Sequence, residues 1–161
     1  MFQKILVAVD ESSISKQALE EAITLAKLAN SNLLLVHVQS PFEATYPTRV
    51  FPYESTYPGT QAAAFKLQLE EWSAIEQQGV QFLQALTDQA TAEGVDADFT
   101  QPLGNPGHVI CDLAQTWGAD LIMMGRRGRT GINELIGGSV SNYVVHHAPC
   151  SVLAVQGKVT S

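Results

Sequence analysis

The sequence predicts an α/β fold: a doubly wound parallel sheet of five strands, in the order 3-2-1-4-5, with helices on both faces. Short apolar runs alternate with helical periodicity in units of roughly thirty residues, which is typical of right-handed β-α-β crossovers. Residues 4–9 and 120–124 are almost continuously apolar, as in strands covered on both faces. Residues 95–101 alternate apolar with polar side chains, as in an edge strand. These observations favour a central position for the first and fourth strands.

Five segments are expected to form strands, because each is a short run of apolar residues that ends in polar residues, glycine or proline. They are residues 4–9, 33–38, 95–101, 120–124 and 150–155. In the predicted order the winding direction reverses between the first and fourth strands, and open sheets bind ligands beyond the carboxyl ends of strands at such a point. Asp10 and Gly125 follow these two strands, so we expect them to flank one crevice.

Four helices are expected between or after these strands. They cover residues 12–30, residues 61–93, the stretch from the 104–107 turn to Gly118, and residues 139–147. Ser12 or Ser13 can cap the first helix, and Pro149 terminates the last. Gly79 is a possible break in the second helix, because glycine weakens a helix interior.

Residues 39–60 interleave prolines with phenylalanines and tyrosines, which predicts a flexible loop insertion. A stretch of this kind is usually a mobile surface segment, and the alternative is a lid that closes over a bound ligand.

Length and composition favour one domain, residues 1–161, in the cytoplasm. Apolar residues make up 45% of the 161 residues, which is ample for a single core. Cys111 and Cys150 lack the paired spacing of a zinc or redox site, so we interpret them as core residues in a reducing compartment. The first residues run directly into a predicted strand, so we expect no signal peptide, and no apolar run approaches the ~18 residues of a membrane span.

The charge distribution points to a small anion as a ligand. A net charge of −7 opposes binding to nucleic acid and to anionic membranes. No lysine or arginine occurs between Lys66 and Arg126, and then Arg126, Arg127 and Arg129 follow within four positions, beside glycines. Positive charge is therefore concentrated at one spot on an otherwise acidic protein.

The glycine-rich segment 125–141 joins the fourth strand to the last helix and is the main candidate for a phosphate site. A phosphate is bound by converging backbone N–H groups, glycine allows close approach of the chain, and a helix N-terminus adds its dipole. Gly138, Ser139, Val140 and Ser141 would form such a helix start. The structural alternative is that the glycines only turn the chain and Ser139 only caps a helix.

Two common nucleotide loops are excluded by the sequence. No Gly-x-x-x-x-Gly-Lys-[Ser/Thr] motif is present, and the first strand is followed by residues 10–13, Asp-Glu-Ser-Ser, in place of Gly-x-Gly-x-x-Gly. Two acidic residues there would repel a pyrophosphate. The phosphates are therefore expected at the loop after the fourth strand, which leaves Asp10 for a ribose hydroxyl or a metal.

The spacing Gly125-x2-Gly128-x9-Gly138-Ser139 resembles the Gly-2x-Gly-9x-Gly-(Ser/Thr) signature of the ATP-binding branch of the universal stress protein family. The likeness extends to residues 5–10, 35–38, 120–125 and 149–153 and so covers nearly the whole chain. It implies a Rossmann-like fold of the adenine nucleotide α-hydrolase-like type. It also implies binding of ATP, or of ADP, AMP or cyclic AMP, and a role in stress response or signalling.

The resemblance also implies which residues contact the nucleotide. Asp10 would contact the ribose or adenine side, with nucleotide-bound Mg²⁺ as a possible further ligand, and Val38 would bond adenine through its backbone. Ala8 would line the base pocket and Gly125 would lie against the ribose. The phosphates would be held by the remaining candidates, with Arg127 adding charge: Gly128, Gly138, Ser139, Val140 and Ser141.

The last predicted strand suggests a homodimer. Residues 150–155, Cys150 to Val155, form an edge strand without proline or charge, whereas Asp96 and Asp98 protect the opposite edge. We expect two copies to pair through this strand, as the family resemblance also implies.

Two other functions remain open at this stage. One is a slow ATPase or an adenylyl-transferring enzyme, and the other is a scaffold module that binds no nucleotide. The sequence does not identify the protein partners. No catalytic residues are assigned, because no positioned base is evident. Charge at the γ-phosphate could come from Arg126, Arg127 and Arg129, and Asp10 or Glu11 could hold Mg²⁺, so slow hydrolysis stays open. His37, His108, His146 and His147 show no metal-ligand spacing and are interpreted as structural.

Overall fold

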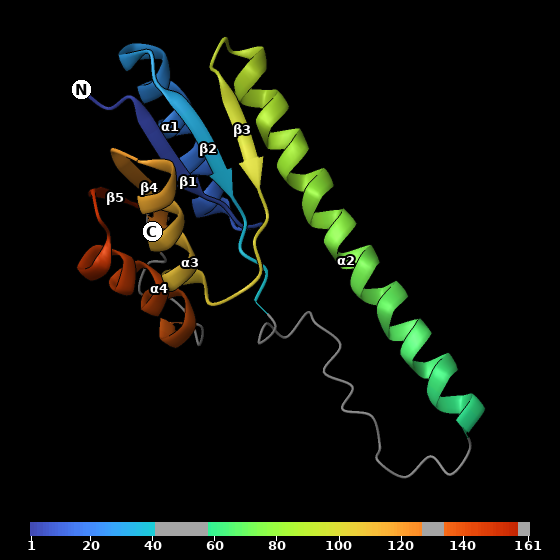
Figure 1. The fold of residues 1–161 in the computed structure, drawn as a ribbon. Helices are drawn as coiled ribbons and strands as arrows, with labels where there is room; N and C mark the ends of the chain where they lie inside the picture. Colours follow the sequence, from blue (N-terminus) through green and yellow to red (C-terminus); the bar gives the residue numbers. More distant parts are fainter. Residues whose placement is uncertain (41–57, 127–133, 158–161) are drawn as a thin grey trace.

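A computed structural model describes residues 1–40, 58–126 and 134–157 of the chain (Figure 1). The strands are β1 (Lys4–Ala8), β2 (Asn32–Val36), β3 (Ala97–Thr100), β4 (Leu121–Arg126) and β5 (Ser151–Gln156). The helices are α1 (Ser13–Ala29), α2 (Pro58–Ala92), α3 (Pro106–Trp117) and α4 (Glu134–His147). Each predicted strand is present, and no end differs from the predicted end by more than two residues.

The strands form one parallel sheet in the order β3-β2-β1-β4-β5, which confirms the predicted topology. β1 is central: Ile5 pairs with Leu33 of β2 on one side and with Leu121 of β4 on the other. β3 lies at the edge, where Asp96 and Asp98 are exposed as the alternating pattern predicted. The winding direction therefore reverses between β1 and β4. Asp10 follows the end of β1 as predicted, whereas Gly125 is the penultimate residue of β4 and not the first residue after it.

Two apolar cores, one on each face of the sheet, hold the helices in place. Ile5 and Val7 of β1 point into the core beneath α1 and α2, whereas Leu6 points into the core beneath α3 and α4. All three side chains are fully buried, and each contributes roughly 1.5–3 kcal/mol relative to an exposed position. This alternation explains why β1 is apolar on both faces.

The ends of α1 and α3 follow the signals seen in the sequence. The Ser12 hydroxyl accepts a hydrogen bond from the Ser15 N–H at 3.2 Å, and α1 ends at Asn30 in the left-handed conformation, with φ 56°. Asn105 caps the start of α3, and Gly118 ends it with φ 76°.

α2 continues through Gly79, so the predicted break at this position is wrong. The reason is a contact with the loop after β3. The Gln101 side chain lies directly against Gly79, where a Cβ would overlap its amide group, and Gln101 Nε2 donates to the Glu76 carbonyl at 3.0 Å. Glycine here permits close approach of a neighbouring side chain and does not end the helix.

The predicted loop insertion is narrower at both ends than residues 39–60. Gln39 forms an isolated parallel bridge with Leu103, and Gln39 and Ser40 are buried. α2 already begins at Pro58, where the fixed φ of proline suits the first helical turn. Residues 41–57, which carry the rest of this prediction, lie outside the described residues.

α4 begins at Glu134, five residues before the predicted start near Ser139, which corrects that prediction. Glycine in a helix interior is unfavourable by only ~1 kcal/mol, so the Gly137–Gly138 pair does not by itself end a helix. The later turns of α4 are anchored, because Val144 is fully buried in the core beneath α3 and α4.

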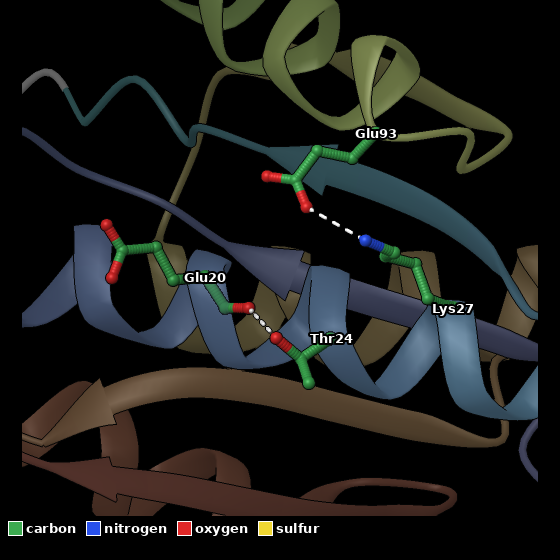
Figure 2. Close-up of polar contacts among 4 residues, drawn as sticks. All are labelled: Glu20, Thr24, Lys27 and Glu93. Carbon is green, nitrogen blue, oxygen red and sulfur yellow. Dashed lines mark hydrogen bonds and ion pairs between the residues drawn. The ribbon is translucent and has the colours of Figure 1, made fainter.

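Figure 2 shows how the end of α2 is joined to α1 on the surface. Lys27 Nζ lies 3.4 Å from Glu93 Oε2, and within α1 the Thr24 hydroxyl donates to the Glu20 carbonyl at 3.0 Å. The side chains of Lys27 and Glu93 are about half exposed, so this ion pair contributes at most ~1 kcal/mol. Within the described ranges, no helix combines the length and apolar character needed to cross a membrane.

Candidate functional site

A cavity of about 160 Å³ lies at the point where the sheet reverses its winding. The ends of β1, β2 and β4 form its floor, and residues of α1, α3 and α4 contribute to its walls. Five of the predicted site residues line it: Ala8, Asp10, Val38, Gly125 and Val140. Residues more than a hundred positions apart in the sequence thus meet at one cavity, as the topological argument predicted.

The remaining predicted site residues do not line the cavity: three lie in α4, and two are outside the described residues. Ser141 is buried in α4, next to Val140. Gly138 and Ser139 belong to α4, and their backbone lies within the helix and not at its first residue. Arg127 and Gly128 lie outside the described residues.

Asp10 stands at the rim of the cavity in a conformation set by the start of α1. Its Oδ1 accepts a hydrogen bond from the Ser12 N–H at 2.7 Å, and its own N–H donates to the Ser15 hydroxyl at 2.8 Å. Ser15 is buried and Asp10 is exposed. An aspartate that bonds the backbone two residues ahead is held in a local turn, so the carboxylate is oriented before any ligand arrives.

Gly125 brings the end of β4 close to α1. A Cβ at this position would lie 2.5 Å from Ile14 Cγ2 and 3.2 Å from the Ile14 carbonyl carbon. Only glycine allows the strand and the first turn of α1 to approach this closely. The resemblance implied that Gly125 lies against a ribose, which stays a prediction; within the chain its neighbour is Ile14.

The apolar walls of the cavity were missed by sequence reasoning. Val36, Ile110 and Met124 line it together with Ile14 and Pro106. Val36, Ile110 and Met124 match the pattern of core residues in the sequence and are buried in the core beneath α3 and α4, whereas Ile14 and Pro106 are half-buried. Their position at the carboxyl end of a strand or near the start of a helix was the signal that could have identified them.

His37 lines the cavity and is also tied to α2. Its Nδ1 lies 3.1 Å from Gln101 Oε1, and its ring contacts Phe82 edge-on, with centroids 6.2 Å apart. The His147 ring stacks on Tyr143 with centroids 4.0 Å apart, and the His108 ring lies tilted against Tyr143 with centroids 4.3 Å apart. In the part of the chain that the structure describes, no three histidine, cysteine, aspartate or glutamate side chains form a metal cluster.

The two cysteines lie outside the cavity and behave as core residues. Cys111 is buried and Cys150 is half-buried, and both pack in the core beneath α3 and α4. Burial raises the pKa of both thiols, and nearby acidic side chains raise it further. Their thiolate fraction at neutral pH is therefore small, which agrees with a structural role.

Comparison with protein families identifies a match to the universal stress protein family over residues 1–156. The universal stress protein Sll1388 of Synechocystis is 36% identical over 159 residues, which cover 96% of this chain and 98% of that protein. The universal stress protein YxiE of Bacillus subtilis is 33% identical, over 97% of this chain and all of that protein.

Solved structures share the fold over almost the full length. The protein MJ0577 aligns with a TM-score of 0.76 at 21% identity, covering 99% of both chains. A universal stress protein in complex with cAMP aligns with a TM-score of 0.63 at 22% identity, over 96% of this chain and 97% of the other. A family member from Arabidopsis thaliana with AMP bound has a TM-score of 0.60 at 22% identity, over 98% and 93% of the two chains. At these identities the structural likeness concerns the fold alone, whereas the family match and the sequence relatives together show that the chain belongs to the universal stress protein family.

Proposed function

We propose that this protein belongs to the ATP-binding branch of its family and binds an adenine nucleotide, ATP foremost, at the cavity between β1 and β4. The observation that carries the proposal is the convergence of Ala8, Asp10, Val38, Gly125 and Val140 on one cavity at the topological switch point. Relatives of this fold hold cAMP and AMP, which makes adenine nucleotides the first ligands to test.

The cavity divides into an apolar part and a polar rim, as a nucleoside requires. Val36, Ile110 and Met124 offer apolar contacts for a purine ring, and the backbone of Val38 would bond its edge. Asp10 would accept a hydrogen bond from a ribose hydroxyl, because its carboxylate is exposed and already oriented by Ser12. Mg²⁺ that arrives with ATP phosphates needs only one or two protein carboxylates, so Asp10 also fits that role.

The phosphate part of the proposal requires a change in α4. The first four N–H groups of a helix, counted from its N-cap, have no intrahelical acceptor, and with a start at Glu134 the last of these belongs to residue 136. If Gly138, Ser139, Val140 and Ser141 hold phosphate through their N–H groups, the first turn of α4 must open. We expect ATP to change the hydrogen-exchange rates of the amides of residues 134–141 and to leave those of α3 unchanged. Unchanged exchange in α4 with ATP bound would contradict this phosphate site.

Calorimetry with ATP, AMP and cyclic AMP tests the proposed function. Gly128→Val should abolish the binding heat, because a branched side chain blocks backbone approach to phosphate. Gly131→Val is the matched control, since Gly131 is in the same segment but outside the glycine signature.

Asp10→Ala should weaken binding at least tenfold, because a hydrogen bond to a charged group contributes ~1.5–3 kcal/mol. Asp112→Ala, at another exposed aspartate, is the control for Asp10→Ala. No heat with any of the three nucleotides would refute the proposal.

We infer a role in stress response or signalling, in which the bound nucleotide alters conformation or the choice of protein partner. The cytoplasmic location expected from the sequence stays part of this proposal. Mass spectrometry of small molecules released from the purified protein would identify the nucleotide that the cell supplies. If the purified protein contains no adenine nucleotide and none of the three nucleotides gives binding heat, the remaining function is a scaffold module that binds no nucleotide.

We further propose a homodimer through β5. This strand is the outer strand of the sheet beside β4, and Ser151, Leu153 and Ala154 are exposed along it. An outer strand without charge presents backbone groups that can pair with a second copy. Leu153→Lys should shift the sedimenting species from dimer towards monomer, whereas a wild-type protein that is monomeric at micromolar concentration would contradict this interface.

A further inference from the structure

One side chain in the loop after β3, that of Gln101, bonds both to a residue of the cavity and to α2. Its Oε1 lies 3.1 Å from Nδ1 of His37, which lines the cavity at the end of β2. Its Nε2 donates to the Glu76 carbonyl of α2 at 3.0 Å. The series His37, Gln101 and Glu76, which we call the Gln101 link, therefore runs from the cavity to the long helix.

The hydrogen bonds of the Gln101 link have a fixed direction. The Glu76 carbonyl can only accept, so the amide nitrogen of Gln101 faces it and the amide oxygen faces His37. This oxygen can also only accept, so Nδ1 of His37 carries the proton when the imidazole is neutral. The contact with α2 thus orients Gln101, and Gln101 in turn fixes the tautomer and the ring orientation of His37.

Backbone bonds on both sides of Gln101 hold it against the end of β2. The His37 N–H donates to the Thr100 carbonyl at 3.2 Å, and the Gln39 N–H donates to the Pro102 carbonyl at 2.8 Å. These bonds continue the pairing of β2 with β3 directly before and after Gln101. The backbone of Gln101 and that of His37 therefore move together, and the variable part of the link is its contact with α2.

α2 carries a glycine at the point where the Gln101 amide lies. Glycine weakens a helix interior, but a Cβ on Gly79 would overlap the Gln101 amide, so the close contact requires this residue. Gly79 precedes Leu83, which is fully buried in the core beneath α1 and α2, by about one helical turn. Figure 1 shows α2 projecting beyond β3 on the N-terminal side of this region. The Gln101 link thus holds α2 close to the place where it leaves the sheet.

We propose that the Gln101 link couples nucleotide binding to the attachment of α2, with Gln101 as the positioning residue. This inference rests on the adenine-nucleotide site proposed above. His37 lies between Val36 and Val38, which both line the cavity, so a nucleotide that contacts this segment favours the arrangement that the link holds. The coupling is reciprocal: a formed link raises nucleotide affinity by the same factor by which bound nucleotide favours the link. α2 is then the element through which the bound nucleotide changes the conformation of the protein.

Calorimetry with ATP tests the coupling from the side of the nucleotide. Gln101→Ala removes the amide and Gly79→Ala displaces it, so each variant breaks the link and should weaken ATP binding at least ~5-fold. The double variant should bind no more weakly than either single variant, because all three have lost the same link. Gln84→Ala is the matched control: Gln84 is an exposed glutamine of α2 whose amide bonds to Asp88 of its own helix, and its replacement should leave affinity unchanged.

Hydrogen exchange tests the coupling from the side of α2. In the wild-type protein, saturating ATP should slow the exchange of the amides of residues 76–82. This slowing should be absent in Gln101→Ala and in Gly79→Ala at ATP concentrations that saturate each variant. The amides of residues 86–92 are the internal reference, because this end of α2 packs on the sheet whether or not the link is formed.

The outcomes distinguish this inference from the function on which it rests. If ATP gives no binding heat with the wild-type protein, both are overturned. If ATP binds but leaves the exchange of residues 76–82 unchanged, or binds the two single variants as tightly as wild type, the coupling alone is overturned. Additive losses of affinity in the double variant would show that Gln101 and Gly79 act separately, and they would also overturn the coupling.

Discussion

Gly125 sets the width of the candidate site, because it lets β4 approach the first turn of α1. Gly125→Ala would place a methyl group against Ile14, including its backbone, and we expect a loss of ~1–3 kcal/mol of unfolding free energy. Nucleotide affinity should fall as well, since both residues line the cavity. Chemical denaturation and calorimetry measure these effects. Combining Gly125→Ala with Ile14→Ala should recover part of the stability, and strict additivity of the two losses would contradict the proposed contact.

Asp120 joins the N-terminal segment to the start of β4 through an exposed carboxylate. Its Oδ2 accepts hydrogen bonds from the Gln3 and Lys4 N–H groups, both at 2.9 Å. The bond from Lys4, followed by that from Gln3, holds the pKa of Asp120 below its ordinary value. The carboxylate thus binds protons less readily in the folded state than in the unfolded state.

The sign of the pH dependence follows from this lowered pKa. The contribution of Asp120 to stability is complete above the unfolded pKa of ~3.9 and is lost as the pH falls through the folded pKa. Urea denaturation at decreasing pH should therefore show a shallower acid-induced loss of stability for Asp120→Asn than for wild type. Equal acid slopes for the two proteins would show that the Asp120 hydrogen bonds do not contribute.

At the scale of elements, Gly79 and Gln101 connect α2 to the loop after β3. Gly→Ala in a helix interior normally stabilises by ~1 kcal/mol. At Gly79 the new methyl group would displace the Gln101 amide and break its bonds to Glu76 and His37. The Gln101 amide is the end of a flexible side chain and can move aside, so the cost is the loss of these two hydrogen bonds, ~1 kcal/mol each. We therefore expect the usual helix gain to be cancelled at Gly79→Ala. Thermal denaturation measures the change, and a gain of the full ~1 kcal/mol would contradict this packing.

A matched double variant separates the two effects at Gly79. With Gln101→Ala in place the clash disappears, so adding Gly79→Ala should then be neutral or stabilising. The comparison also tests whether Gln101 links His37, which lines the cavity, to the point where α2 leaves the sheet. If Gly79→Ala has the same effect in both backgrounds, the two residues are not coupled.

For the whole molecule, nucleotide binding and global stability should be linked. A ligand at a hundred times its Kd raises the unfolding free energy by ~2.7 kcal/mol, which for a protein of this size corresponds to about 5–10 °C in Tm. ATP should produce this shift in wild type and in Gly131→Val, but not in Gly128→Val. Equal shifts in the two glycine variants would contradict binding through the glycine signature.

Much of the fold was predictable because its signals are local. The apolar runs located the strands, Ser12, Asn30 and Asn105 marked helix ends, and the contrast between central and edge strands indicated the order of the sheet. The position of the site followed from that order, since a switch point exists wherever the winding reverses. The likeness to the universal stress protein family rested on glycine spacing, which is also local.

Other features depended on contacts between distant segments and needed the tertiary structure. Gly79 lies inside an unbroken helix with Gln101 packed against it, and α4 starts at Glu134, ahead of a glycine pair that disfavours a helix without ending it. The apolar walls of the cavity, Ile110 and Met124 among them, match the pattern of core residues until the fold brings them together. The sequence by itself determined which segments form strands, their order and where the cavity lies. Tertiary packing decided where helices begin and which side chains meet, because these depend on neighbours far along the chain whose burial outweighs local preferences of about 1 kcal/mol.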